Sequence, residues 1–200
     1  MKVIFLDFDG VINSQKFYHK RHRMLMSGEL THKQMAVDYP FWDFCPELVN
    51  SLNKIVKLTG AKVVVSSTWR KGRRLGDLQA ILNMIGFKGE VIDKTPELSF
   101  RIPTDDTYTN STVPRGCEID RWLQDNGNFQ RINWSKDKQL EYLEKSKVKN
   151  YIILDDDSDM LYKQREHFIK TNTYSGLGDF ETALAIKILN TPLVDLYYPD

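Results

Sequence analysis

The sequence predicts an α/β fold built on a doubly wound parallel sheet. Short apolar runs that are typical of buried strands alternate with longer segments that have the apolar periodicity of helices. Several of these runs end abruptly in polar residues, as strands do where they reach the ligand-binding edge of such a sheet. The chain has 200 residues, a length that predicts one domain spanning residues 1–200 with a substantial core.

The first strand is predicted over Val3–Leu6 and organises the candidate site. It stops at the sequence Asp7-Phe8-Asp9-Gly10. Carboxylates at alternate positions lie on the same side of an extended chain, so Asp7 and Asp9 should both project at the carboxyl end of this strand. Aspartate before glycine is also common in turns, so the motif alone leaves a turn-capping role open.

Residues 13–44 follow and are too long for an ordinary strand-to-helix connection. We predict a small insertion folded over the end of the first strand. Neither it nor residues 94–114 is large enough for a full cap domain. The insertion holds a basic cluster that suits either a polyanionic substrate or a solvated helix face: Lys16, His19, Lys20, Arg21, His22 and Arg23.

A helix is predicted from Pro46 to just before Gly60, because proline favours the start of a helix and glycine its end. Residues 61–65 then form a second buried strand, which ends in the sequence Ser66-Ser67-Thr68-Trp69-Arg70. Hydroxyls at this position suit either an anion site or the N-cap of the next helix. That helix is predicted over residues 73–85, with a basic stretch at 70–74 that is either an exposed face or a nucleic-acid contact.

The remaining elements repeat the same alternation. A short strand is predicted near residues 90–92, a lid-like surface loop over 94–114, and a helix that begins at Arg115. Residues 126–147 are predicted to be polar and partly helical. A further buried strand over Tyr151–Leu154 stops at Asp155, Asp156 and Asp157, and it is followed by a strand at 168–170 and a helix at 180–189.

Composition excludes several classes of protein. The formal net charge is +1, which gives the whole chain no attraction to nucleic acid or an acidic membrane. No apolar run approaches the ~20 residues of a membrane span. Cys45 and Cys117 lie far apart and are predicted to be reduced thiols. The chain also begins directly with a strand, without room for a signal peptide, so we expect a cytoplasmic protein.

The predicted sheet gives these motifs a chemical meaning. Its parallel strands bring Asp7 and Asp9, the hydroxyls of residues 66–68 and the acids of 155–157 to one edge. Clustered carboxylates without nearby His or Cys favour a hard cation, Mg²⁺ in preference to Zn²⁺. Ser66 and Arg115 suit a phosphate bound to that cation. Phosphoryl transfer needs mainly positioning and charge neutralisation, and an aspartate can attack phosphorus.

The order of these motifs resembles the haloacid dehalogenase-like (HAD) phosphohydrolase superfamily. A D-x-D-G-V sequence, a strand-end serine, a basic residue at a helix start and a strand-end acid pair occur in the same order over nearly the whole chain. Three phrases are similar to HAD-type domains of modular RNA-repair proteins: Ser66-Ser67-Thr68-Trp69-Arg70, Arg115-Gly116-Cys117-Glu118-Ile119 and Ile153-Leu154-Asp155-Asp156-Asp157.

The resemblance implies a role for each matching residue. Asp7 is implied as the nucleophile and a Mg²⁺ ligand, and Asp9 as the general acid/base whose backbone carbonyl also binds the metal. Ser66 is implied as the phosphoryl-binding residue, assisted by Ser67 or Thr68. Arg115 is implied to neutralise the phosphate, and Asp156 to be the main acidic metal ligand of the last motif, supported by Asp155 directly or through water. The run of three acids leaves the division between Asp155 and Asp156 open by one position.

We therefore expect a Mg²⁺-dependent phosphomonoester hydrolase that acts on a phosphorylated substrate, with a nucleotide or a nucleic-acid 3′-phosphate end as the leading candidate. The alternatives are a small-metabolite phosphatase and a non-catalytic phosphate-binding module. Four aromatic residues suit either base stacking or core packing: Phe17, Tyr18, Trp42 and Trp69. The sequence predicts neither the natural substrate nor the oligomeric state.

Overall fold

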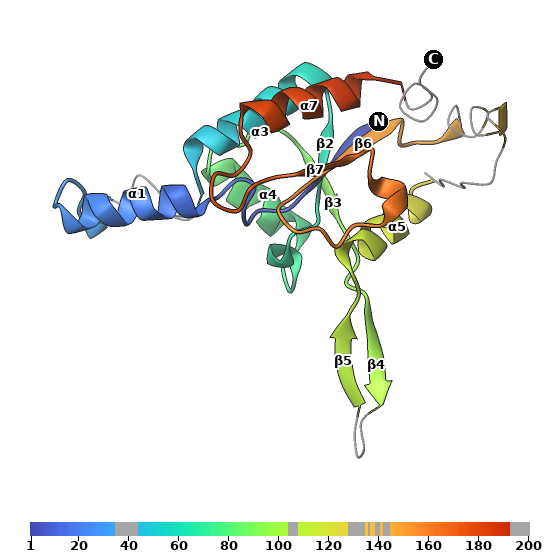
Figure 1. Ribbon diagram of the computed structural model, residues 1–200, viewed down its shortest axis with the longest axis horizontal. Helices are drawn as coiled ribbons and strands as arrows, with labels where there is room; N and C mark the ends of the chain where they lie inside the picture. Colours follow the sequence, from blue (N-terminus) through green and yellow to red (C-terminus); the bar gives the residue numbers. More distant parts are fainter. Residues whose placement is uncertain are drawn as a thin grey trace.

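A computed structural model describes residues 1–34, 44–103, 108–127, 135, 137–138, 141 and 145–192, without the side chains of 102–103 and 108–110. It confirms the predicted parallel sheet, which has five strands in the order β3-β2-β1-β6-β7 (Figure 1). The strands are β1 (Lys2–Leu6), β2 (Lys62–Val65), β3 (Val91–Lys94), β6 (Asn150–Asp155) and β7 (Phe168–Lys170).

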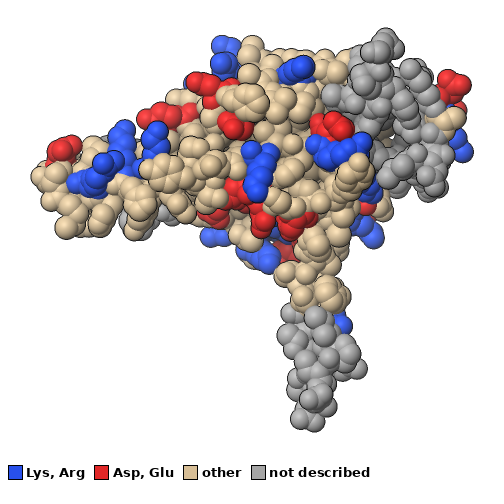
Figure 2. Space-filling model, viewed as in Figure 1, with Lys and Arg blue, Asp and Glu red and all other residues tan. Residues whose placement is uncertain are grey.

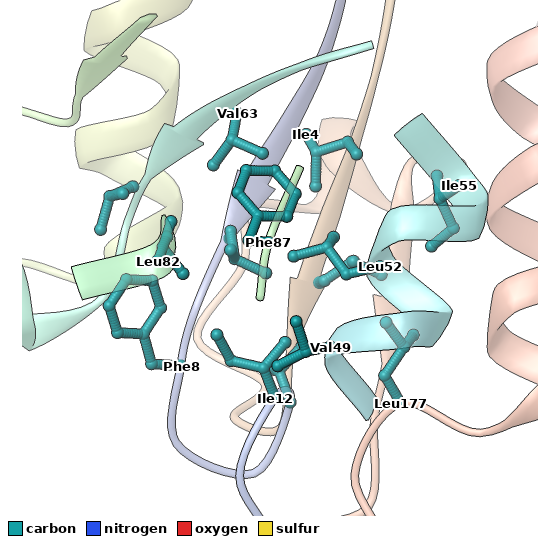
Figure 3. Packing of buried hydrophobic residues seen from close by; sticks show 14 of the residues in the cluster. Ile4, Phe8, Ile12, Val49, Leu52, Ile55, Val63, Leu82, Phe87 and Leu177 are labelled. Carbon is teal, nitrogen blue, oxygen red and sulfur yellow. The ribbon is translucent and has the colours of Figure 1, made fainter. Parts of the chain in front are cut away.

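Helices cover both faces of this sheet because its strands are apolar on both sides. Ile4 and Leu6 of β1 belong to a core cluster with α3 (Pro46–Thr59), α4 (Leu75–Met84) and α7 (Asp179–Asn190) (Figure 3). Val3 and Phe5 point the other way and pack with α5 (Arg115–Asp125). Burying one such side chain contributes about 1.5–3 kcal/mol, so β1 is held from both faces.

The insertion after β1 contains a helix, α1 (Gln15–Met26), which extends from the body of the molecule (Figure 1). Ser14 caps it by accepting a hydrogen bond from the Phe17 N–H at 3.3 Å. Of the predicted basic cluster, Arg21 is buried over the Phe17 ring, while the other members are exposed. Figure 2 shows Lys and Arg side chains gathered over α1. Residues 35–43 of the insertion lie outside the described part, and no large cap is evident in the rest of the chain that the structure describes.

The prediction of a lid-like loop is wrong for much of residues 94–114. The chain there forms an antiparallel hairpin of β4 (Ser99–Pro103) and β5 (Tyr108–Thr112), which projects away from the sheet (Figure 1). Thr and Tyr favour extended backbone, but this segment has no continuous apolar face, so its sequence does not show the periodicity of a core strand.

The other predicted elements agree with the structure within a few residues. The helix predicted over 73–85 begins at Leu75, because the Asp77 carboxylate accepts the N–H of Arg74 at 3.1 Å and caps the helix start. Most of the predicted excursion at 126–147 lies outside the described residues. Cys45 and Cys117 are not joined in a disulfide. No helix among the described residues has both the length and the apolar character needed to cross a membrane.

His167 gives the fold a pH dependence that we expect to measure. Burial lowers the pKa of His167 from 6.5 to about 4, although the hydrogen bond between Nδ1 and the Tyr151 carbonyl opposes this. The unfolded chain therefore takes up a proton near pH 6.5 that the folded protein rejects until about pH 4. Stability should fall by about 3 kcal/mol as the pH drops through this window.

The variant His167→Phe tests this expectation. Phenylalanine can keep the stacking on Tyr151, whose ring centroid lies 3.9 Å away, but it does not titrate. The loss of unfolding free energy between pH 7 and pH 4 in urea titrations should be clearly smaller in the variant than in the wild type. Parallel curves for the two proteins would show that His167 does not carry the effect.

Candidate active site

The sheet register places three polar strand ends at the same level. Leu6 of β1 pairs with the last residue of β2 and with Leu154 of β6. Asp7, Ser66 and Asp155 therefore follow side by side at the carboxyl edge. The Asp7 N–H donates to the Leu154 carbonyl at 3.0 Å, and the Ser66 N–H donates to the Leu6 carbonyl at 2.9 Å. The structure thus brings together the strand ends that the sequence predicted to converge.

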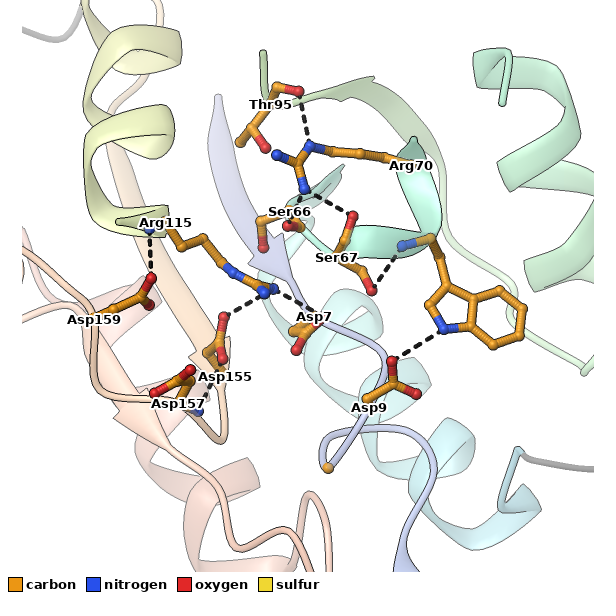
Figure 4. A network of polar contacts seen from close by, with 12 residues as sticks. Asp7, Asp9, Ser66, Ser67, Arg70, Thr95, Arg115, Asp155, Asp157 and Asp159 are labelled. Carbon is orange, nitrogen blue, oxygen red and sulfur yellow. Dashed lines mark hydrogen bonds and ion pairs between the residues drawn. The ribbon is translucent and has the colours of Figure 1, made fainter. Parts of the chain in front are cut away.

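Asp7 and Asp155 are buried carboxylates that share one guanidinium. Arg115 Nη1 lies 3.0 Å from Asp7 Oδ1 and 3.2 Å from Asp155 Oδ2 (Figure 4). Burial raises the pKa of Asp7 above its usual range, although Arg115 and the Ser67 hydroxyl oppose the shift. Burial and the charge of Asp7 raise the pKa of Asp155 to about 7. The single positive charge of Arg115 does not neutralise both carboxylates.

The backbone at the start of α5 holds Arg115 in this position. Its N–H donates to Asp159 Oδ2 at 2.6 Å, and the N–H of Gly116 donates to the Asp159 carbonyl at 3.2 Å. A Cβ on Gly116 would come within 2.9 Å of Met160 Cα, so glycine lets the helix approach this loop closely. Burial alone lowers the pKa of Arg115, but the attraction of Asp7 and Asp155 outweighs it and raises the pKa. Arg115 is therefore charged and fixed.

A third acid completes a group that suits a cation. Asp7, Asp155 and Asp156 each offer a carboxylate oxygen, and these oxygens all lie within 4.8 Å of one another. The donors are all oxygen, which Mg²⁺ and Ca²⁺ prefer over the nitrogen and sulfur ligands typical of zinc. These three carboxylates, of which Asp7 and Asp155 are buried and share the single charge of Arg115, leave an excess of negative charge. A divalent cation fits this arrangement because it would neutralise that excess.

Asp156 is held from two sides. Its Oδ2 accepts a hydrogen bond from the Thr173 hydroxyl at 2.6 Å. On the other side it lies against the backbone of Gly10, whose carbonyl accepts from the Thr171 hydroxyl at 2.7 Å. Gly10 has a φ of +68°, and a Cβ there would lie 2.8 Å from Asp156 Cβ and closer still to its carboxylate. Glycine is thus required twice at this position, once for backbone angle and once for space.

We expect Mg²⁺ to stabilise the protein against unfolding, and we expect Gly10→Ala to remove this stabilisation. The left-handed backbone alone costs about 1–2 kcal/mol, and the new methyl group must also displace Asp156 from the acid cluster. The wild type should gain about 3 kcal/mol at a Mg²⁺ concentration roughly 100 times its Kd. Thermal unfolding with and without Mg²⁺ measures this gain.

Gly60→Ala is the matched control for this experiment. Gly60 has the same φ of +68°, but a Cβ there meets nothing within 4 Å. The Gly60→Ala variant should therefore be destabilised by the left-handed backbone alone, and it should keep the full stabilisation by Mg²⁺. An equal response to Mg²⁺ in both variants would show that the contact between Gly10 and Asp156 does not support metal binding.

The three hydroxyl side chains predicted at the end of β2 have different surroundings. Ser66 is fully buried, and its Oγ makes no hydrogen bond to any residue that the structure describes. An unsatisfied buried hydroxyl is costly, so a ligand at this edge would relieve it. Ser67 Oγ accepts the backbone N–H of Trp69 at 3.3 Å and interacts with Asp7. Ser67 therefore both caps the short helix that follows and contacts the candidate site. Thr68 is exposed.

Arg70 corrects one interpretation of the basic stretch 70–74. It is only 2% exposed and lies beneath the site instead of on a solvated face. Nη1 donates to the carbonyls of Ser66 and Ser67 at 2.8 and 2.9 Å, and Nε donates to the carbonyl of Thr95 at 3.1 Å (Figure 4). Nη2 forms an ion pair with buried Glu118 of α5. A short 3₁₀ helix at Thr68–Arg70 turns the side chain inward, which sequence spacing does not reveal.

Asp9 does not join the acid cluster through its side chain. Its Oδ2 accepts the indole N–H of Trp69 at 3.1 Å, and its Oδ1 accepts the Asn13 amide at 2.7 Å (Figure 4 shows the Trp69 contact). Neither contact was predicted from the sequence. The Asn13–Asp9 spacing of four residues is a weak signal, and no local pattern joins Asp9 to a tryptophan sixty positions away.

A small pocket of about 230 Å³ opens beside Asp9 and is lined by Asn13, Ser14, Gln15 and Tyr18 as well. Among the four predicted aromatic residues, Tyr18 is 51% exposed. Phe17 is buried, and half-buried Trp69 packs against Phe8 and Phe44. Trp42 lies outside the described residues. Tyr18 is the most exposed of the three described, and its ring lies parallel to that of His22 with centroids 6.4 Å apart.

The parallel sheet, the D-x-D-G turn after its central strand, the buried hydroxyl, the arginine and the acid cluster together define the HAD class of phosphohydrolases. Comparison with protein families agrees: residues 3–181 match the family described as the HAD domain in Swiss Army Knife RNA repair proteins. The chain belongs to this family, which confirms the resemblance seen in the motifs. No curated protein and no solved structure was found to match the chain. The family supports a phosphohydrolase-type function.

Proposed function

We propose that the protein is a Mg²⁺-dependent phosphomonoester hydrolase in which Asp7 is the nucleophile. The proposal depends above all on one observation, the surroundings of Asp7. This buried carboxylate lies 3.0 Å from Arg115 Nη1 and belongs to the three-acid group. It also lies at the same level of the sheet as the Ser66 hydroxyl, which has no described partner. The Asp7 carboxylate, the Arg115 guanidinium and the Ser66 hydroxyl thus lie at one edge of the sheet. This arrangement supports the binding of a phosphoryl group there.

Asp7 and Asp156 are the side chains proposed to hold Mg²⁺, with Asp155 acting directly or through water and the Asp9 carbonyl completing the set. The bound ion would neutralise charge on the phosphoryl oxygens. Asp155 is already paired with Arg115, whereas Asp156 makes no ion pair among the described residues. This difference supports Asp156 as the main acidic ligand of the last motif.

In the first half-reaction, a carboxylate oxygen of Asp7 attacks phosphorus and the bond from phosphorus to the leaving oxygen breaks. The leaving oxygen takes a proton from Asp9 and departs as an alcohol. Arg115 and Ser66 hold the phosphoryl oxygens, so charge that develops during the transfer is met by a fixed guanidinium and a hydroxyl donor. The product on the protein is an aspartyl phosphate at Asp7.

In the second half-reaction, Asp9 removes a proton from water, and the water oxygen attacks the same phosphorus. The bond between phosphorus and the Asp7 oxygen breaks, which releases inorganic phosphate and restores the Asp7 carboxylate. Asp9 is then protonated and ready for the next substrate. One carboxyl group can serve as acid and then as base because the two steps require opposite proton transfers.

The substrate that we propose is a nucleotide or the 3′-phosphate end of a nucleic acid. Because Asp9 protonates the leaving oxygen, the pocket beside Asp9 would receive the leaving group, where Tyr18 offers an exposed ring for stacking. Helix α1 continues outward from this pocket and carries the exposed cations Lys16, Lys20 and Arg23. These charges suit the phosphodiesters of a longer strand. The match to the HAD domain in Swiss Army Knife RNA repair proteins supports the same class of substrate.

A phosphatase screen with and without Mg²⁺ tests this function. We expect 3′-phosphorylated oligonucleotides to be hydrolysed with higher kcat/KM than mononucleotides, and both with higher kcat/KM than sugar phosphates. A preference for sugar phosphates would favour the small-metabolite alternative, which the small volume of the pocket also suits. Phosphate binding without hydrolysis of any substrate would favour a non-catalytic module and would exclude the proposed reaction.

A further inference from the structure

We infer that Trp69 and Asn13 are positioning residues that aim the carboxyl group of Asp9 at the leaving oxygen. The inference rests on the proposed function, and it adds two residues whose effect passes through Asp9. Its basis is that both oxygens of one carboxylate are held by N–H donors from separate elements, at 3.1 Å from Trp69 and 2.7 Å from Asn13.

Asp9 needs such positioning because of where it lies. It follows the end of β1 in a turn, and its side chain is exposed. An exposed aspartate changes rotamer freely, and a proton donor is useful only when it points at the atom that receives the proton. Two N–H donors on the two oxygens fix the rotation of the carboxyl plane. Each oxygen keeps a lone pair to carry or accept a proton.

Asn13 is itself oriented by the turn that it supports. Its Oδ1 accepts the Gly10 N–H at 2.8 Å, so its other amide atom must be the nitrogen that donates to Asp9. The main chain of Asn13 also forms a β-bridge with Phe44. Asn13 therefore links the Asp9 turn through its amide, and the segment before α3 through its main chain, to the start of α1.

Trp69 is fixed from three directions. Its ring packs against those of Phe8 and Phe44, with centroids 5.8 and 5.2 Å away. The guanidinium of Arg73 lies 5.4 Å from the ring centroid, and the backbone N–H of Trp69 donates to Ser67 Oγ. The indole thus joins the hydroxyl-bearing loop after β2 to the acid after β1. Figure 4 shows it beside Asp9, on the side away from Arg115 and Asp155.

The test compares two phosphate monoesters that differ in how much they need a proton donor. The p-nitrophenyl ester releases a weakly basic phenolate and needs little protonation, whereas glycerol 2-phosphate releases a strongly basic alkoxide and needs an acid. Trp69→Phe removes the indole N–H and keeps an aromatic ring, and Asn13→Ala removes the amide. We expect each variant to lower kcat/KM by about 10- to 100-fold on glycerol 2-phosphate and less than about threefold on the p-nitrophenyl ester.

Trp122→Phe is the matched control. Trp122 Nε1 also donates to a carboxylate, that of Asp93 at 2.6 Å, but Asp93 lies on β3, away from the acid cluster. This variant makes the same chemical change, and it should not lower kcat/KM for one ester more than for the other. If Trp69 acted only by supporting the fold, Trp69→Phe would lower both rates equally and the inference would be wrong.

A second measurement uses the background of Asp9→Asn. If Trp69 and Asn13 act through Asp9, adding either substitution to Asp9→Asn should cause no further loss on glycerol 2-phosphate. Additive losses would overturn the inference. The proposed function fails in a different way, through a wild-type protein that hydrolyses neither ester in Mg²⁺. The two ideas are therefore tested separately.

Discussion

Replacing Asp7 with asparagine is expected to reduce hydrolysis of p-nitrophenyl phosphate by at least about 10⁴-fold. An amide cannot form the bond to phosphorus that starts the proposed reaction, and losses of this order follow removal of a nucleophile in other hydrolases. The exchange leaves the shape of the side chain nearly unchanged. Initial rates at saturating Mg²⁺ measure the loss, and turnover near the wild-type rate would exclude Asp7 as the nucleophile.

The same variant should be at least as stable as the wild type when metal is absent. Burial raises the pKa of Asp7, so the folded protein holds this charge less favourably than the unfolded chain does above the normal pKa of aspartate. Asparagine removes that cost and leaves Asp155 as a partner for Arg115. In EDTA the melting temperature of Asp7→Asn should equal or exceed that of the wild type.

We expect Mg²⁺ to reverse this order, because the ion should stabilise the wild type on binding and the variant lacks one of the proposed ligands. Asp125→Asn is the control for the same chemical change. Asp125 lies at the exposed end of α5, where it pairs with Arg121, and exposed pairs of this kind contribute little. Loss of activity in both variants, or a destabilised Asp7→Asn in EDTA, would contradict our assignment.

Much of the candidate site follows from the sequence because each part stands at a strand or helix end. Apolar runs stop at Asp7, Ser66 and Asp155, and a parallel sheet brings such ends to one edge whatever their separation along the chain. Arg115 could be placed because it begins a clear amphipathic helix. To predict these positions, one needs only the order of strands and helices along the chain. That order can be read from the apolar periodicity of the sequence.

The contacts that orient the site leave no such signal. Trp69 and Asp9 meet because two loops fold toward each other, and an aromatic residue after a strand is more often part of the core. Asp159 holds the backbone of Arg115 from a loop after β6. The sequence could not distinguish Arg70 from Arg73 and Arg74, since only the turn at 68–70 decides which of them is buried.

That distinction leads to a large expected effect on stability. Arg70→Ala should lower the free energy of unfolding by about 3–5 kcal/mol, because it leaves the Glu118 carboxylate buried without its ion-pair partner. It also removes the donor to the carbonyls of Ser66, Ser67 and Thr95. For a chain of this length, such a loss lowers the melting temperature by roughly 10 °C. Urea and thermal unfolding measure it.

The comparison with Arg74→Ala separates burial from charge. Arg74 is exposed and pairs with Asp77 at the surface, so its removal should leave the unfolding midpoint nearly unchanged. Arg70→Lys should recover only part of the loss, because one ammonium can pair with Glu118 but cannot reach all the acceptors that lie around a planar guanidinium. An Arg70→Ala variant as stable as Arg74→Ala would show that the buried network contributes nothing.

The double variant Arg70→Ala/Glu118→Ala identifies the source of the cost. If the lone carboxylate dominates, removing it as well should recover part of the lost stability. If the orphaned carbonyls dominate, the double variant should be no more stable than Arg70→Ala. Glu118 also accepts the Leu98 N–H at 3.0 Å, so recovery should be incomplete in either case. Partial recovery would show that Glu118 is tolerated in the core only because Arg70, which also donates to the carbonyls of Ser66 and Ser67, lies beside it.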